Sequence, residues 1–174
     1  MNIIYVVEDF SENGGVERIV SEKANTLSTQ YHHNVTLISV YHDDRPQRYR
    51  LNKSIKFILL DVPFAKHTSN SVSRLFSRLD TMLTASIRLN KAIKPLNPDI
   101  IFFTTTLGAI LLPFCRTKAR KIYESHLARK FNPFNSMFFL TERSAERVVC
   151  LTSGDAKEFR HCLLYTSPSP RDTR

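Results

Sequence analysis

A pair of glycines, Gly14-Gly15, lies between an apolar run and a helical pattern near the start of the chain. A missing Cβ lets backbone N–H groups approach a phosphate, and the helix dipole favours negative charge at a helix N-terminus. Glycine also serves any tight turn, so a simple flexible loop is the alternative interpretation. The four glycines form neither a G-x-G-x-x-G motif nor a P-loop, which argues against dinucleotide-dependent dehydrogenases and P-loop ATPases.

Two charged residues, Glu17 and Arg18, fall in the first turn of the helix that follows the glycines. The helix dipole favours a carboxylate at this position and disfavours a guanidinium. Glu17 is therefore either a solvated residue of the helix start or a carboxylate that binds a ligand. Arg18 goes against the dipole, which suggests an anionic neighbour in the folded protein.

A histidine, His126, ends the run KIYESH just after an apolar strand. An imidazole at this place can polarise or orient a substrate hydroxyl or phosphate near neutral pH. A surface histidine in a loop is the alternative interpretation. The remaining histidines have no spacing that suits a metal ion, so the sequence predicts no metal site.

The elements that must position these residues alternate between apolar strands and helices. Short β-branched runs predict buried parallel strands, and the segments between them predict helices. This alternation indicates right-handed crossovers and a parallel sheet with helices on both faces, an α/β Rossmann-like fold. The expected strands are Ile3–Val7, Val35–Val40, Ile55–Leu60, Ile100–Phe103, Lys121–Glu124 and Arg147–Leu151.

Three loops follow the first, fourth and fifth expected strands, and in such a sheet ligands bind outside the carboxyl ends of the strands. These loops are Asp9–Gly15, Thr104–Thr106 and Ser125–Lys130. The sequence therefore predicts a binding site that they share.

Apolar residues at helical spacing predict a long amphipathic helix from about Val72 to Ile93. Pro95 and Pro98 mark its end, because proline cannot continue a helix. We expect its apolar stripe to cover the sheet while its charges face water. A second interpretation is that the helix rests on an anionic membrane surface. The stripe comprises Leu75, Phe76, Leu79, Met82, Leu83, Ser86, Ile87 and Ile93, and the basic residues are Arg74, Arg78, Arg88, Lys91 and Lys94.

The overall composition is that of one soluble globular domain, with a formal charge of +9 across 174 residues. Such a charge suits an anionic partner: a phosphate-bearing substrate, lipid headgroups or nucleic acid. The basic residues form no block and accompany no nucleic-acid-binding motif, so we expect no nucleic-acid partner. Three distant cysteines and the lack of a long apolar run favour a cytoplasmic location without a membrane span.

The last thirteen residues, CLLYTSPSPRDTR, show no helical or strand period and contain two Ser-Pro steps. They resemble either a disordered tail or a sequencing adapter translated in frame, and we favour the adapter. We therefore expect one native domain over residues 1–161, ended by truncation, and a non-native tail over residues 162–174.

Several runs, in their order and spacing, resemble the N-terminal domain of glycosyltransferase family 4, which consists of retaining enzymes with the GT-B fold. The resemblance extends from Met1 to about Arg160. The runs are NIIYVVE, NGGVERIVSEKANTLS, NVTLISVY, NPDIIFF, KIYESH and RVVCLTSGDAKEF.

This resemblance implies the N-terminal half of an enzyme that transfers a sugar from a nucleotide-sugar donor to a glycan or lipid-linked acceptor in polysaccharide biosynthesis. Gly14 and Gly15 match the glycine loop near the donor diphosphate, and His126 matches a histidine that contacts the transferred sugar or its phosphate. Candidate contacts on the acceptor side are Glu17, Arg18, Thr104 and Thr105.

The resemblance also implies that no metal cofactor is needed. The paired glutamates and basic residues that grip the donor are absent from this chain, so we expect the chain alone to be inactive. A cytoplasmic protein, peripheral at the inner membrane face, is the expected setting. A Rossmann-like module that binds an anion or a partner without catalysis is the alternative function.

Overall fold

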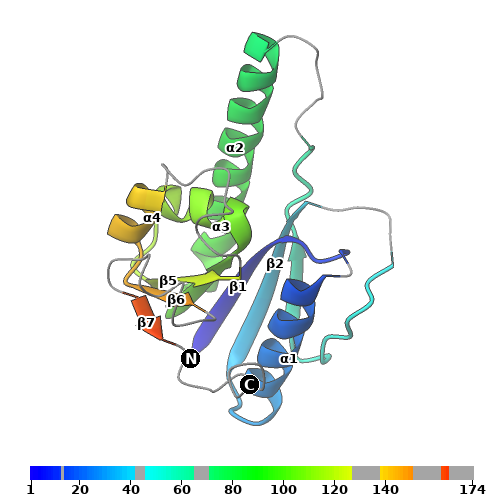
Figure 1. Cartoon of the computed structure of the whole chain (residues 1–174). Helices are drawn as coiled ribbons and strands as arrows, with labels where there is room; N and C mark the ends of the chain where they lie inside the picture. The colour runs from blue at the N-terminus through cyan, green and yellow to red at the C-terminus, as the bar shows by residue number, and fades with distance from the viewer. Residues whose placement is uncertain (13, 42–45, 65–70, 127–137, 151–161, 165–174) are drawn as a thin grey trace, which may run out of the picture.

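The computed structural model of the chain describes residues 1–12, 14–41, 46–64, 71–126, 138–150 and 162–164. A parallel sheet of seven strands forms its centre, in the order β3-β2-β1-β4-β5-β6-β7 (Figure 1). All six neighbouring pairs are parallel. The strands are β1 Asn2–Asp9, β2 Asn34–Tyr41, β3 Lys56–Leu59, β4 Ile100–Thr104, β5 Arg120–Ser125, β6 Arg147–Cys150 and β7 Cys162–Leu164.

The described helices connect these strands and cover both faces of the sheet. The α-helices are α1 Gly15–Thr29, α2 Ser71–Ile93, α3 Thr105–Leu111 and α4 Phe138–Ser144. Two short 3-10 turns, η1 Lys94–Leu96 and η2 Leu112–Phe114, each contain a proline. This architecture confirms the predicted α/β Rossmann-like fold.

Each face of the sheet has its own apolar core, because successive side chains of a strand point to opposite faces. On the α1 side, Tyr5 and Val7 of β1 pack with Val20 and Ala24 of α1. On the other side, residues of β1, β4 and β5 pack with α2 and α3, including Val6, Phe103, Tyr123, Leu89 and Leu111. Gly108 lets α3 approach β4, since a Cβ there would lie 3.2 Å from the Phe103 carbonyl carbon.

The strand order reverses at β1, so that the chain leaves β1 toward β2 on one side and returns to β4 on the other. The crevice between β1 and β4 is therefore the topological switch point of the sheet, where open α/β sheets bind ligands. The loop after β1, the start of α3 after β4 and the end of β5 all reach this carboxyl edge.

The expectation that the apolar stripe of the long helix covers the sheet was wrong for most of the stripe. α2 buries Thr81, Ala85, Leu89 and Ile93, of which only Ile93 belongs to the predicted stripe. Small side chains at two of these four positions let the helix lie close to its neighbours, although they contribute little to an apolar pattern. Most of the predicted stripe is exposed.

Residues 162–164 form a strand, β7, that pairs with β6, with Cys162 opposite Val148. We expected no strand in this segment. Three residues are too few to show an alternating pattern, so the sequence could not indicate this strand. The boundary between a native domain and a non-native tail at residue 161 remains a prediction.

Candidate functional site at the carboxyl edge of the sheet

The loop after β1 begins with a tight turn that Asp9 forms through its own side chain. Its Oδ1 accepts hydrogen bonds from the backbone N–H and the hydroxyl of Ser11, at 2.8 and 2.6 Å. Such Asx turns are a common way of ending a strand. Asp9 and Ser11 are both buried, and the N–H of Phe10 donates to the Ser39 hydroxyl at 3.0 Å. These contacts fix the path of the chain toward the glycine pair.

Gly14 is the N-cap of α1, and Glu17 is the third residue of the helix. The Glu17 carboxylate folds back onto the backbone N–H of Gly14, as in one half of a capping box. A Cβ on Gly14 would collide with Glu17 Oε2, so an alanine at this position would force the Glu17 carboxylate to move. Glu17 is therefore a buried cap of the helix and not a solvated residue, whereas its role as a ligand contact stays a prediction.

Gly15 and Arg18 lie at the surface of the same turn. A Cβ on Gly15 would meet nothing within 4 Å, so local packing does not explain this glycine. Arg18 has the anionic neighbour that its position suggested: Glu22 lies 3.9 Å away on the next turn of α1. Both side chains of this pair are mostly exposed, and such pairs contribute little to stability.

Carboxylates gather around the end of β1. Burial raises the pKa of Glu8 above its ordinary value; Thr105 lowers it in part, and the charges of Glu12, Glu17 and Asp9 raise it further. Burial likewise raises the pKa of Glu17, against hydrogen bonds from its own N–H and that of Gly14. This part of the edge is therefore negative, although the chain as a whole is positive.

Two threonines join β4 to α3 at the same edge. The Thr104 hydroxyl donates to the Val6 carbonyl of β1 at 3.0 Å and is fully buried, which ties the two strands together at the switch point. Thr105 has a φ of 62°, a left-handed conformation that β-branched residues rarely adopt. Its buried hydroxyl lies close enough to Glu8 to lower that pKa, yet forms no aligned hydrogen bond with the described residues. Strained residues of this kind cluster at functional sites.

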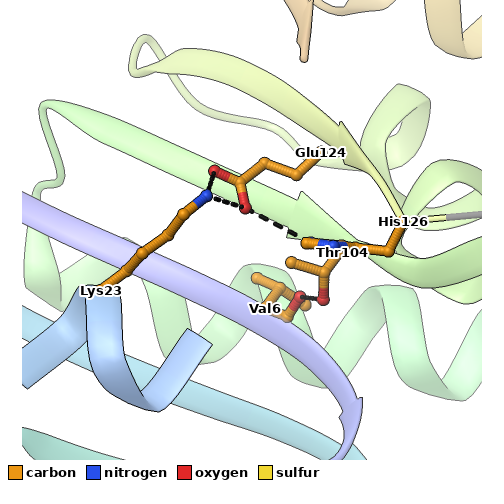
Figure 2. A network of polar contacts seen from close by, with 5 residues as sticks. All are labelled: Val6, Lys23, Thr104, Glu124 and His126. Carbon is orange, nitrogen blue, oxygen red and sulfur yellow. Dashed lines mark hydrogen bonds and ion pairs between the residues drawn. The ribbon is translucent and has the colours of Figure 1, made fainter. Parts of the chain in front are cut away.

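The end of β5 holds a chain of three polar side chains, which Figure 2 shows. Lys23 of α1 donates to both carboxylate oxygens of Glu124, at 3.0 and 3.1 Å. Glu124 Oε2 lies 3.5 Å from His126 Nε2. Burial alone would raise the pKa of Glu124, but His126 and Lys23 together hold it below its ordinary value. A charged Glu124 therefore connects α1 to the imidazole.

The imidazole of His126 is nearly buried, with 6% of its side chain exposed. Neither ring nitrogen has an aligned hydrogen bond within the described part of the chain. Buried polar atoms are usually paired, so an unpaired imidazole is a candidate for binding a ligand. The rest of the predicted loop, residues 127–130, lies outside the described residues.

The structure brings the three predicted loops to one edge of the sheet. β1, β4 and β5 are consecutive neighbours, which separates the ends of β1 and β5 by roughly 10 Å at the usual strand spacing. Glu8 and Thr105 lie on the α3 side of this edge, and the Glu124–His126 pair lies on the α1 side with Lys23. The Arg18 side chain is mostly exposed and pairs with Glu22, which is not part of this group.

Three residues of this edge, Glu8, Lys23 and Glu124, were not among the predicted site residues. A signal existed for Glu8, since an acidic residue directly after the apolar run Ile3–Val7 must reach the ligand edge. The KIYESH run places Glu124 beside His126 at the ligand edge, but its contacts with Lys23 and the imidazole could not be predicted from it. Lys23 gave no signal, because its contact with Glu124 joins residues 101 positions apart.

No group of three His, Cys, Asp or Glu side chains suited to a metal ion occurs among the residues that the structure describes. Within that part of the chain, no helix is long and apolar enough to cross a bilayer. A cavity of about 600 Å³ lies away from the candidate site, at the opposite edge of the sheet, where Pro98 and Thr117 precede β4 and β5.

Comparisons with known proteins give a likeness in structure only. No protein-family model matches the chain, and no curated protein matches it in sequence. Solved structures of several enzymes are similar to it in fold. The lipopolysaccharide outer core galactosyltransferase WaaB matches with a TM-score of 0.66 and 14% identity, over 91% of this chain and 41% of WaaB.

The sucrose-phosphate synthase from Thermosynechococcus elongatus matches with a TM-score of 0.67 and 11% identity, over 94% of this chain and 47% of the synthase. A UDP-N-acetylglucosamine 2-epimerase matches with a TM-score of 0.54 and 13% identity, over 90% of this chain and 43% of the epimerase. The chain thus spans less than half the length of each of these proteins. At these identities the likeness shows the fold alone: this chain has the fold of a Rossmann-like domain that forms part of each of these enzymes.

Proposed function

We propose that the chain is the acceptor-side domain of a glycosyltransferase, which moves a sugar from a nucleotide-sugar donor to a hydroxyl of a glycan or lipid-linked acceptor. The observation that carries this proposal is the buried imidazole of His126, which lies against Glu124 at the carboxyl edge of the sheet and has no aligned hydrogen bond with the described residues. The similarity to two sugar transferases supports it.

The chemistry of the edge suits a ligand rich in hydroxyl groups. Carboxylates accept hydrogen bonds from hydroxyls, and Glu8 lies at this edge with its carboxylate only partly buried. The Glu8 carboxylate itself is a poor partner for a diphosphate, because like charges repel. We therefore assign the Glu8 side of the site to sugar or acceptor hydroxyls.

His126 is the residue that we assign to the reacting sugar. We assign the ring proton to Nε2, which lies 3.5 Å from Glu124 Oε2, so that Nδ1 is left to accept a hydrogen bond from a hydroxyl. If the imidazole is protonated, Nδ1 instead donates to a sugar oxygen or a phosphate, and Glu124 stabilises the positive charge.

Gly14 and Gly15 keep their proposed place beside the donor diphosphate. Support for this role is stronger at Gly15, because a Cβ added there would meet no atom within 4 Å and packing therefore does not require a glycine. At Gly14 the Glu17 carboxylate already occupies the helix end. We further propose that retention of the anomeric configuration, freedom from metal and an acceptor from polysaccharide biosynthesis all follow the resemblance to glycosyltransferase family 4.

The test uses this domain joined to a donor-binding domain, with a panel of nucleotide sugars and glycan or lipid-linked acceptors. We expect release of the nucleoside diphosphate only when an acceptor is present, with the sugar found on the acceptor by mass spectrometry. The 174-residue chain alone should release none. Conversion of a nucleotide sugar to its epimer without acceptor, or binding without turnover in the joined protein, would contradict the proposal.

A further inference from the structure

One face of α2 carries an exposed apolar stripe that no described residue covers. The six side chains are between 46% and 67% exposed, whereas the helix buries a different face. They recur every three or four residues and so lie along one side of the helix. The stripe comprises Val72, Leu75, Phe76, Leu79, Leu83 and Ile87.

The N-terminal half of α2 extends well beyond the sheet, as Figure 1 shows. None of residues 71–80 is buried. α2 contains a single acidic residue, Asp80, against four basic ones. This half of the helix can therefore meet a flat surface without obstruction from the body of the domain.

The stripe continues directly into a cationic groove. Asn90 and Lys94 follow Ile87 at helical spacing, and with Lys91, Asn97, Arg116 and Thr117 they line a cavity of about 600 Å³. No carboxylate lines this groove. Its three cations, Lys91, Lys94 and Arg116, form no ion pair with the acidic residues that the structure describes.

We propose that this face of α2 docks onto the surface of an anionic lipid bilayer. The apolar stripe would enter the boundary between headgroups and acyl chains, and the adjoining cations would bind lipid phosphates, as in other interfacial amphipathic helices. A formal charge of +9 adds long-range attraction to such a surface. A symmetric dimer through this face would bring like charges together, which disfavours a second copy as the occupant. This inference stands apart from the proposed function, since binding to lipid needs no sugar.

The experiment is vesicle flotation with the 174-residue chain at low ionic strength. Vesicles of phosphatidylcholine alone are compared with vesicles that contain about one third phosphatidylglycerol, because basic residues respond to anionic lipid. Two double variants test the surface: Phe76→Ser with Ile87→Ser, and Lys91→Glu with Lys94→Glu. Matched controls change exposed residues elsewhere: Phe139→Ser with Leu140→Ser, and Lys53→Glu with Lys56→Glu.

We expect binding to the anionic vesicles that weakens with added salt and falls at least about tenfold in both α2 variants. Both controls should change binding less than about twofold, since they leave the α2 surface intact. Circular dichroism should show that all four variants keep their helix content. Equal binding to neutral vesicles, or α2 variants that bind like the controls, would overturn the proposal. So would sedimentation velocity that shows self-association through the stripe and no lipid binding.

Discussion

At the scale of single residues, the two neighbouring glycines have different roles. Gly14 leaves room for the Glu17 carboxylate that caps α1, whereas Gly15 opens onto empty space. Because packing within the fold accounts for Gly14, only Gly15 needs another explanation, and a bound ligand would provide one. The glycine pair is therefore one structural position followed by one candidate binding position.

Substituting each glycine by alanine separates these roles. We expect Gly14→Ala to lower the free energy of unfolding by about 1 kcal/mol, since the new Cβ displaces the Glu17 cap. Gly15→Ala should be neutral or stabilising by up to about 1 kcal/mol, because alanine is the better helix former. Urea denaturation measures both. Equal losses in the two variants would show that the Glu17 cap does not distinguish them.

The raised pKa of Glu8 leads us to predict that its effect on stability depends on pH. An acid whose folded pKa lies above its ordinary value of about 4.5 destabilises the fold when it is ionised, and this cost disappears as the pH falls below that value. Glu8→Gln should therefore raise the melting temperature at pH 7 by a few degrees and bring almost no gain near pH 4. The exposed Glu22→Gln serves as control. A loss of stability at pH 7 would mean that the Glu8 carboxylate is stabilised in the fold.

At the scale of elements, the positions of most strands along the chain and their parallel arrangement were predictable, whereas some contacts between elements were not. β-Branched runs such as Ile3–Val7 and Val35–Val40 indicated buried strands, and a parallel sheet necessarily brings the ends of β1, β4 and β5 to one edge. The face that α2 buries was not predictable, because Thr81 and Ala85 pack through small size and leave no apolar signal. The α1–β5 contact depends on a pairing across 101 positions, which local pattern cannot show.

This α1–β5 contact, between Lys23 and Glu124, is open to a double-mutant cycle. Lys23→Met should destabilise the protein by about 1–3 kcal/mol, because it leaves the buried Glu124 carboxylate without its lysine. Adding Glu124→Gln should recover part of that loss, since the unpaired charge is then removed. Lys91→Met, at a lysine with no described ion pair, is the control. If the double variant is as unstable as the sum of the single ones, the two residues do not interact.

The Lys23–Glu124 pair also predicts a loss of stability in acid. The folded pKa of Glu124 lies below its ordinary value of 4.5, so its stabilising effect is complete above that value and is lost as the pH falls through the folded pKa. The stability difference between the wild-type chain and Glu124→Gln should therefore shrink below about pH 4. Chemical denaturation at several pH values measures it, and a difference that stays constant into strong acid would contradict this interpretation.

At the scale of the whole molecule, the account depends on one arrangement: His126, Glu124 and the loop after β1 share the carboxyl edge of a parallel sheet. The sequence predicted this edge from the rule that ligands bind outside the carboxyl ends of parallel strands, and from the position of His126 just after a strand. It could not show that the imidazole is buried and has no aligned hydrogen bond with the described residues, since that depends on Glu124, Lys23 and the packing of α1.

The most direct test of the account is His126→Ala in the domain joined to a donor-binding domain, with the exposed His32→Ala as control. Sugar transfer and melting temperature are measured on the same samples. We predict that His126→Ala lowers turnover by about 100-fold, the scale of a positioned acid–base group, while the melting temperature changes by no more than a few degrees. Turnover equal to that of His32→Ala, or a loss of turnover matched by a loss of folding, would contradict the account.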